Sequence, residues 1–382
     1  MRATGLRATL TAGFGVLSLL TLVGCTVATP EAVEEPTIGC MISAPAGFDD
    51  HSAGALTLAE TQRARAAGIF SSTSSQRVSD GSATSAALKR MSDQGCALTT
   101  VIGPGGADEL REHAVDHPDQ VFLGIASGRD DFPDNVLSMD FDLVPAAFIA
   151  GYTAATASET GKVAALVSRG FPQGEDILDA FDAGVDLHNK EKDDEDAPDV
   201  KSYRESRIGG RTVDDTDRGG RRFFDTAVDA DADVVVPFGS AASMGVITAA
   251  TESHLNASTA EPCGDDDSEE VLPKVIWYGA SGAFSDAIIA TIEPNIRRGL
   301  RTIFPQWPQS RNPDEVAERS DTKPEDVGGF LVADRRYEGT ISNGGVVITA
   351  EDGFLSRVSD AGRNISDLRE RIKSGDIDPQ KS

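Results

Sequence analysis

Short β-rich runs alternate with helical stretches along most of this chain of 382 residues, and that alternation constrains its fold more than any other feature. Strands that alternate with amphipathic helices form a mostly parallel sheet with helices on both faces. In the first half the predicted strands are Ile38–Ser43, Ala97–Ile102, Val121–Ile125 and Val136–Phe141, and the predicted helices are Ser52–Ala67, Ser85–Gln94 and Ala107–His117.

The alternation restarts after a boundary near Asp140–Val144, which predicts a second lobe of similar build. A helix at Asn295–Phe304 is expected to return to the first lobe. The other elements expected here are strands at Val163–Val167, Val234–Val236, Val275–Tyr278 and Gly328–Ala333, helices at Asp176–Leu187, Arg221–Ala230, Ala241–Thr251 and Asp360–Ser374, and an extended stretch at Gly345–Thr349.

We therefore assign residues 37–143 and about 293–320 to lobe 1, and residues 144–292 and about 321–382 to lobe 2. The expected fold class is α/β, with two Rossmann-like lobes and a central cleft. Ligands of open α/β sheets bind beyond the carboxyl ends of the strands. The first strand–helix turn is therefore the first place to look for a site.

The N-terminus has the layout of an export signal. Arg2 and Arg7 precede an apolar run that ends at Leu22-Val23-Gly24-Cys25, which is the order of a secretory signal peptide. A small residue followed by cysteine also resembles a bacterial lipobox, in which Cys25 takes a lipid and becomes the mature N-terminus. We expect residues 1–24 to be a lipoprotein signal peptide and residues 25–36 a flexible linker. An ordinary secretory signal or an uncleaved anchor is the alternative.

The composition excludes some classes of partner. A formal charge of −27 argues against nucleic-acid binding, which rewards clustered Lys and Arg. The acidic runs Glu191–Asp199 and Asp265–Glu270 read as solvated loops, since they lack the alternating ligands of a calcium loop. No metal or cofactor is expected, and the sequence gives no sign of oligomerisation, so we expect a monomer.

Four cysteines fit an exported protein. Cys40 lies in the first predicted strand and Cys96 begins a later one, and these strands would be neighbours in a doubly wound sheet. A disulfide between them is geometrically plausible. Cys263 is either free or the true partner of one of the two.

Polar side chains follow the first predicted strand. Asp49, Asp50 and Ser52 come directly before a helix, where any of them can cap its N-terminus. The functional alternative places them at the rim of a cleft, where they would accept hydrogen bonds from sugar hydroxyls or an amine. A catalytic triad around His51 is not indicated, because no Gly-x-Ser-x-Gly elbow accompanies it.

Several segments together resemble one family. They include CMISAPAGFDDHSAGAL, DQVFLGIA, NVLSMDFDLVPAAFIAGYTAA, DADVVVPFGSAASMGV, VIWYGASG and NGGVVITAEDG, in the same order and at similar spacing over nearly the whole mature chain. The sequence is similar to the basic membrane lipoproteins (BMP/PnrA-like), the nucleoside-binding lipoproteins of ABC transporters. The resemblance implies a type I periplasmic-binding-protein-like fold, and the pair Cys40 and Cys96 looks like that of actinobacterial members.

The sequence departs from the family pattern where the ligand should lie. Asp49, Asp50 and Ser52 match the first turn, but Ala53 and Gly54 replace the phenylalanine and asparagine that help to hold the base. Trp277, beside Tyr278 at the end of a strand, is the candidate that could replace the missing stacking surface. The alternative is a purely structural role, in which Trp277 packs in the core or at the rim. The other family residues that are absent correspond to Ala126 or Ser127, to Gly279–Gly282 and to Asn295.

The sequence therefore predicts a binding protein rather than an enzyme. We expect a lipid-anchored, extracytoplasmic solute-binding protein at the cell membrane that delivers a small molecule to an ABC permease. The resemblance makes a purine nucleoside the default ligand, and the lost residues favour another neutral or cationic solute nearly as much. The alternative is a transport-deficient surface lipoprotein that acts as an interaction or sensing module.

Overall fold

A computed structural model describes residues 37–192, 197–203, 211–259, 271–282, 284–307, 330–331, 335–355 and 361–380. All of them belong to one compact unit. The predicted signal peptide, the linker, the lipidation site Cys25 and Cys263 lie outside the described residues. No helix within the described ranges is both long and apolar enough to cross a bilayer.

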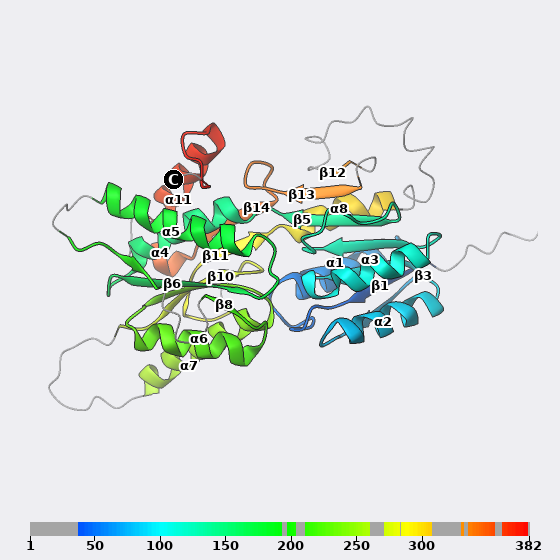
Figure 1. Cartoon of the computed structure of the whole chain (residues 1–382), viewed down its shortest axis with the longest axis horizontal. Coiled ribbons are helices and arrows are strands. Elements are labelled where there is room, and N and C mark those ends of the chain that lie inside the picture. The colour runs from blue at the N-terminus through cyan, green and yellow to red at the C-terminus, as the bar shows by residue number, and fades with distance from the viewer. Residues whose placement is uncertain are drawn as a thin grey trace, which may run out of the picture. The chain divides into compact units, whose positions relative to one another are not determined.

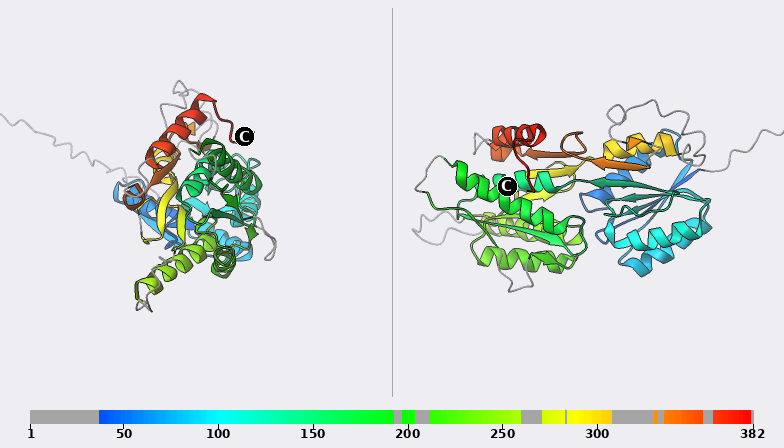
Figure 2. Two further views of the ribbon diagram at one scale, coloured as in Figure 1. Left: turned by 90° about the vertical axis from the view of Figure 1, so that its left-hand side faces the viewer. Right: turned by 45° about the horizontal axis from the view of Figure 1, so that its top comes forward.

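The first lobe is built on a sheet with the strand order β12-β13-β5-β4-β3-β1-β2. All its pairings are parallel except that of β12 with β13. Helices α1 and α8 pack together, as do α2 and α3, and the two pairs cover opposite faces (Figure 2). The elements are β1 Ile38–Ile42, α1 Ala53–Ala66, β2 Ser72–Gln76, α2 Gly81–Asp93, β3 Cys96–Ile102, a 3₁₀ turn Pro104–Gly106, α3 Ala107–Asp116, β4 Val121–Ile125, β5 Val136–Phe141, α8 Ile296–Gln306, β12 Phe330–Leu331 and β13 Arg336–Gly339.

The second lobe is built on a sheet with the order β14-β11-β10-β9-β6-β7, and β8 also pairs with β6. Helices α4 and α5 cover one face and α6 and α7 the other (Figure 1). The elements are α4 Val144–Ala157, β6 Lys162–Ser168, α5 Gly174–Glu191, β7 Lys201–Ser202, β8 Thr212–Val213, α6 Asp217–Asp229, β9 Val234–Phe238, α7 Ala241–Thr259, β10 Lys274–Tyr278, β11 Ile288–Pro294, β14 Val346–Ala350, α10 Asp352–Leu355 and α11 Ala361–Ser374.

The predicted fold class is confirmed, since two mostly parallel sheets each carry helices on both faces. One part of the expected division into lobes differs. Residues from about 321 to 382 were expected in lobe 2, but β13, which the sequence analysis did not predict, pairs with β5, with Glu338 opposite Asp140, so β12 and β13 belong to the first sheet. Strand β14 and helix α11 do lie in lobe 2.

Three segments of chain cross between the lobes, and backbone hydrogen bonds join them. The crossings follow β5, β11 and β13. The Asp142 N–H donates to the carbonyl of Gly339 at 2.9 Å, and the Asn295 N–H donates to the carbonyl of Gly345 at 2.7 Å. These bonds hold the three crossings side by side.

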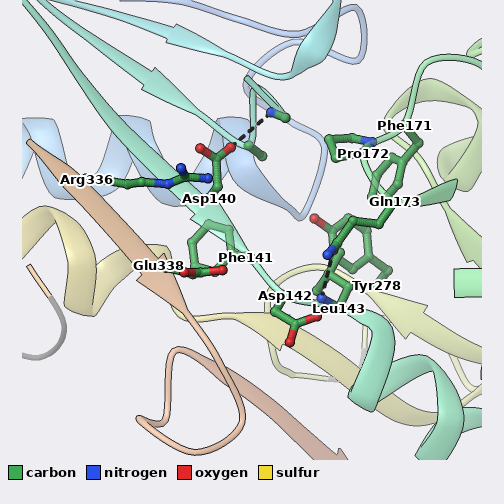
Figure 3. Close-up of a pocket in the computed structure, with 12 residues that line it drawn as sticks. Asp140, Phe141, Asp142, Leu143, Phe171, Pro172, Gln173, Tyr278, Arg336 and Glu338 are labelled. Carbon is green, nitrogen blue, oxygen red and sulfur yellow. Dashed lines mark hydrogen bonds between the residues drawn. The ribbon is translucent and has the colours of Figure 1, made fainter. Parts of the chain in front are cut away.

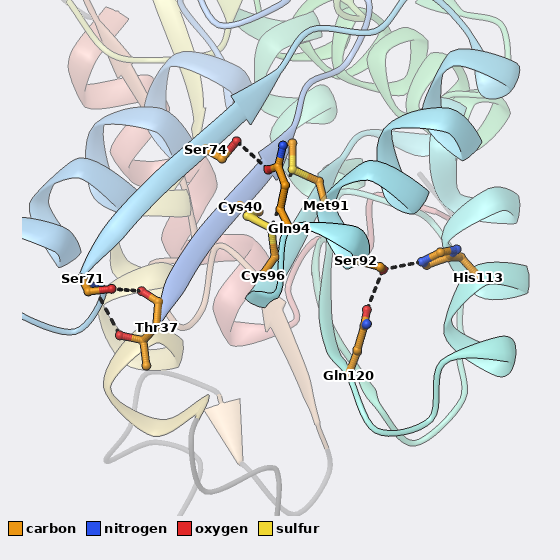
Figure 4. Close-up of a disulfide and its surroundings, with 10 residues drawn as sticks. All are labelled: Thr37, Cys40, Ser71, Ser74, Met91, Ser92, Gln94, Cys96, His113 and Gln120. Atoms are coloured by element: carbon orange, nitrogen blue, oxygen red, sulfur yellow. Dashed lines mark hydrogen bonds between the residues drawn. A yellow bond between two sulfur atoms is a disulfide. The ribbon is translucent and has the colours of Figure 1, made fainter. Parts of the chain in front are cut away.

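A disulfide joins Cys40 on β1 to Cys96 on β3, with their Cα atoms 5.9 Å apart (Figure 4). Both side chains are buried in an apolar cluster with Leu88 and Met91 of α2. The geometrically plausible pairing is therefore the one present in the structure. It ties together two neighbouring strands that are 56 residues apart in the sequence.

Glycines allow two pairs of helices in lobe 2 to pack at backbone contact. A Cβ on Gly151 of α4 would overlap the carbonyl oxygen of Phe181 on α5. A Cβ on Gly220 of α6 would likewise overlap the carbonyl oxygen of Ala242 on α7. The same solution is used on both faces of the second sheet.

Replacing both Cys40 and Cys96 by alanine should lower the free energy of unfolding by about 4 kcal/mol, because the disulfide closes a long loop in the unfolded chain. Urea unfolding of the oxidised wild type and of the variant measures this difference. Adding a reductant should shift the wild type toward the variant and leave the variant unchanged. Equal stability of wild type and variant would contradict the prediction.

Gly151→Ala and Gly220→Ala should each destabilise the fold by about 1–3 kcal/mol, because the added methyl group must push two helices apart. In an open helix the same change would instead stabilise by up to about 1 kcal/mol. Gly105→Ala is the matched control, since a Cβ there meets nothing within 4 Å. Thermal unfolding that leaves all three variants equal to wild type would show that the close packing is absent.

Candidate functional site

A cavity of about 180 Å³ lies where the carboxyl ends of strands from both lobes meet the crossings (Figure 3). The loops after β4 and β6 and the end of β10 contribute to it, together with β5 and β13. This is the position at which open α/β sheets bind ligands. The lining residues are Ala126, Gly128, Asp140, Phe141, Asp142, Leu143, Phe171, Pro172, Gln173, Tyr278, Arg336 and Glu338.

The pairing of β5 with β13 explains why charged side chains gather here. Side chains alternate between the two faces of a sheet along each strand. Asp140 is the register partner of Glu338, and Arg336 lies two residues before Glu338 on the same strand, so all three share one face. On the opposite face Met139 and Tyr337 are fully buried.

Asp140 is only partly satisfied by the protein. Its Oδ1 accepts hydrogen bonds from the Gly128 N–H at 3.0 Å and from the Ser127 hydroxyl at 3.3 Å. Its Oδ2 is buried, and no described residue donates a hydrogen bond to it. Burial raises the pKa of Asp140, and the charge of Arg336 offsets part of that rise.

Asp142 and Glu338 carry charges that no ion pair neutralises within the described part of the chain. Asp142 accepts a hydrogen bond from the Val144 N–H at 3.3 Å. Burial raises the pKa of Asp142, and the negative charge of nearby Glu338 raises it further. The two carboxylates therefore repel each other beside the cavity.

Tyr278 of the second lobe places a hydroxyl at the cavity. Its side chain is only 5% exposed, and its ring meets Phe171 edge-on at 5.5 Å. No described residue forms a hydrogen bond with the hydroxyl, which points toward the cavity in Figure 3. Burial, and to a lesser extent the charge of Asp50, raises the pKa of Tyr278, so the hydroxyl stays protonated.

Backbone strain gathers around the same boundary between the lobes. Five described residues other than glycine have positive φ, and three of them are His51 (47°), Ala126 (51°) and Gln173 (57°). Ala126 and Gln173 line the cavity, and His51 lies at the contact between the lobes. Such conformations cost about 1–3 kcal/mol each and are concentrated at functional sites.

The predicted first-turn residues have different environments. The Asp50 carboxylate is buried and accepts hydrogen bonds from the N–H groups of Ser52, Gly54 and Ala55, each at 2.9 Å, so it caps α1. Ser52 is buried at the N-cap and makes no capping bond with its side chain. Asp49 is exposed. Asp50 therefore has the structural role of a helix cap.

The first turn also contacts the second lobe directly. The His51 carbonyl accepts hydrogen bonds from the Ala280 N–H at 2.7 Å and from the Trp277 indole N–H at 3.3 Å. The His51 ring stacks on Phe284, with ring centroids 4.0 Å apart. Trp277 itself is only 1% exposed and packs in the core of lobe 2. The roles of Asp49, Asp50, Ser52 and Trp277 in ligand binding stay predictions.

Sequence reasoning placed a site at the first turn but did not single out Asp140, Asp142 and Glu338. A signal was available in the alternation Ser138-Met-Asp140-Phe-Asp142, which has the period of a strand with one polar face. Alternation of polar and apolar residues alone indicates a strand with one face in solvent more often than it indicates a binding site. The pairing with β13, two hundred residues away, is what turns that face into a cavity wall.

Comparison with known proteins agrees with this architecture. The family model for PnrA-like ABC transporter substrate-binding proteins (Bmp) matches residues 40–270. Basic membrane protein A of Borreliella burgdorferi is 34% identical over 110 residues, which cover 27% of this chain and 31% of that protein. The chain is thus matched to less than a third of the length of that relative.

Solved structures share the fold at low sequence identity. A solute-binding protein of an ABC transporter system from Aeropyrum pernix K1 has a TM-score of 0.66 at 15% identity, with 90% of this chain and 93% of that chain covered. A solute-binding protein from Conexibacter woesei has a TM-score of 0.51 at 17% identity, with 90% and 98% covered. Because the family model spans more than half of the sequence, this chain belongs to the Bmp family of PnrA-like ABC transporter substrate-binding proteins.

Proposed function

We propose that this protein is a lipid-anchored, extracytoplasmic substrate-binding protein that holds a small molecule between its lobes and delivers it to an ABC permease. The observation that carries the proposal is the cavity lined by residues of both lobes at the carboxyl ends of their strands. Membership in the Bmp family supports the same conclusion.

Ligand binding would act on the angle between the lobes. A ligand that contacts both lobes stabilises the closed form by the difference between its affinities for the closed and the open form. The hydrogen bonds from Ala280 and Trp277 to the carbonyl of His51 are contacts that lobe opening would break. A permease that recognises the closed form would then receive only loaded protein.

We propose that the first turn contributes to the site as well. Asp49 and Ser52 lie next to the contact with lobe 2, on either side of the capping residue Asp50. The negative charge of Asp50 also contributes to the raised pKa of Tyr278. Trp277 lies beneath the same contact and would stack on a ligand only if the ligand displaced His51 from it. A purine nucleoside is the family's default candidate, held in part by these four residues.

Anionic ligands are disfavoured because the protein's own carboxylates occupy the helix N-termini that would attract them. The N–H groups at the start of a helix attract anions. Here Asp50 occupies the start of α1, and Asp215 accepts from the N–H groups of Ser240 and Ala242 at the start of α7. The formal charge of −27 adds a repulsive field. A neutral or cationic solute is therefore proposed.

A solute-binding protein should be stabilised by its solute. In a thermal-shift screen of the mature chain with nucleosides, bases, sugars and amines, a true ligand at one hundred times its Kd should add about 2.7 kcal/mol to the free energy of unfolding. If the ligand is a nucleoside bound at the first turn, Asp49→Ala should reduce the shift without altering the stability of the free protein, because Asp49 is exposed.

The exposed Asp119 provides a control for loss of one negative charge, so Asp119→Asn should keep the full shift. Absence of a shift with every solute would contradict the receptor function and favour a surface lipoprotein that acts as an interaction or sensing module.

The anchor depends on a single thiol. Cys25→Ser should abolish incorporation of labelled palmitate and move the protein from the membrane fraction to the soluble fraction of cells. Fractionation with immunoblotting, alongside Cys263→Ser as the control, measures this. Retention of Cys25→Ser in the membrane fraction would show that another segment provides the anchor.

A further inference from the structure

We propose that the cavity between the lobes takes a small organic cation, whose ammonium group lies among Asp142, Glu338 and the Tyr278 hydroxyl. The proposal rests on the proposed function, because it names the class of solute that the same cleft would bind. It also departs from the nucleoside that the family resemblance makes the default.

The charges around the cavity provide the first argument. Three carboxylates, those of Asp140, Asp142 and Glu338, line it against the single guanidinium of Arg336. In Figure 3 the guanidinium lies on the side of Asp140, away from Asp142. A cation bound near Asp142 and Glu338 would relieve the repulsion between these two carboxylates, which no described cation does.

The Tyr278 hydroxyl provides the second argument, and it is independent of the charges. The side chain is 95% buried, since only 5% of it is exposed, yet no described residue forms a hydrogen bond with its hydroxyl. The hydroxyl oxygen itself is accessible from the cavity. Because the hydroxyl points into the cavity, a ligand there can accept a hydrogen bond from it or donate one to its oxygen.

Aromatic rings make the cavity suitable for an organic ion in particular. Phe141, Phe171 and Tyr278 contribute surface to its wall. Ring faces attract ammonium groups, and the attraction is strongest where water is excluded. The described carboxylates do not form a group that could hold a metal ion. The combination of acids with rings therefore favours an alkylated ammonium over an inorganic cation.

The size of the cavity admits a small organic ion. An apolar cavity of about 150 Å³ can bind benzene, so a cavity of about 180 Å³ has room for an amine with a short carbon skeleton.

The test is calorimetric titration of the mature chain with choline, with putrescine, and with 3,3-dimethyl-1-butanol, which has the shape of choline without its charge. We expect choline or putrescine to bind and the alcohol to bind at least about tenfold more weakly. Glu338→Gln and Asp142→Asn should each weaken binding of the cation by roughly tenfold.

Folding controls are available for each variant. Glu338 is exposed, so Glu338→Gln should not lower the melting temperature of the free protein, and Tyr278→Phe removes one oxygen without changing the packing of the ring. Tyr278→Phe should weaken binding severalfold. Asp119→Asn removes the same charge as Asp142→Asn at a site outside the cavity and should bind the cation like wild type.

The outcomes separate the two proposals. Binding of a nucleoside or sugar that neither Asp142→Asn nor Glu338→Gln affects would overturn the cation proposal and leave the receptor function standing. Equal binding of choline and its uncharged analogue would also overturn it. Failure of cations, nucleosides and sugars alike to bind would overturn both.

Discussion

Three neighbouring chain crossings, joined by backbone hydrogen bonds, are the constraint on which the rest of the structure depends. The bonds from Asp142 to Gly339 and from Asn295 to Gly345 hold the crossings together. Because the chain leaves each sheet at the carboxyl ends of β5 and β11, the crossings bring the corresponding ends of the two sheets to one boundary. The cavity, the strained residues and the contacts of His51 all lie along that boundary.

The alternation of strands and helices was enough to predict both lobes, and the elements that it missed have identifiable reasons. Helix α4 is almost entirely buried, so its sequence shows no polar face whose period could be recognised. Strand β2 is an edge strand of serine, threonine and glutamine, residues that are also typical of a loop. Strand β11 is a parallel neighbour of β10, yet the described residues between the two strands form no helix, so the usual strand–helix–strand pattern is missing.

The candidate site was less predictable than the fold, because its residues gain their meaning from distant pairing. Asp50 stood out in the sequence for its position in a turn, and its carboxylate is used by the helix that follows. Asp142 and Glu338 look like ordinary polar residues of strand ends until β13 is placed next to β5. From the sequence, Tyr278 was a candidate only as an aromatic ring. In the structure its hydroxyl faces the cavity from a buried residue, and burial cannot be deduced from the sequence of a single strand.

The position of the cavity on the crossings has a mechanical consequence. If the lobes rotate about these strands, groups near the axis move little, whereas the first turn, which follows β1 rather than a crossing, moves through a wider arc. A molecule held by Asp142 and Glu338 would keep these two contacts throughout the rotation, and its contact with Tyr278 on the second lobe would form only in the closed form. A small rotation at the axis would then be enough to form or break all the contacts of His51 with the second lobe.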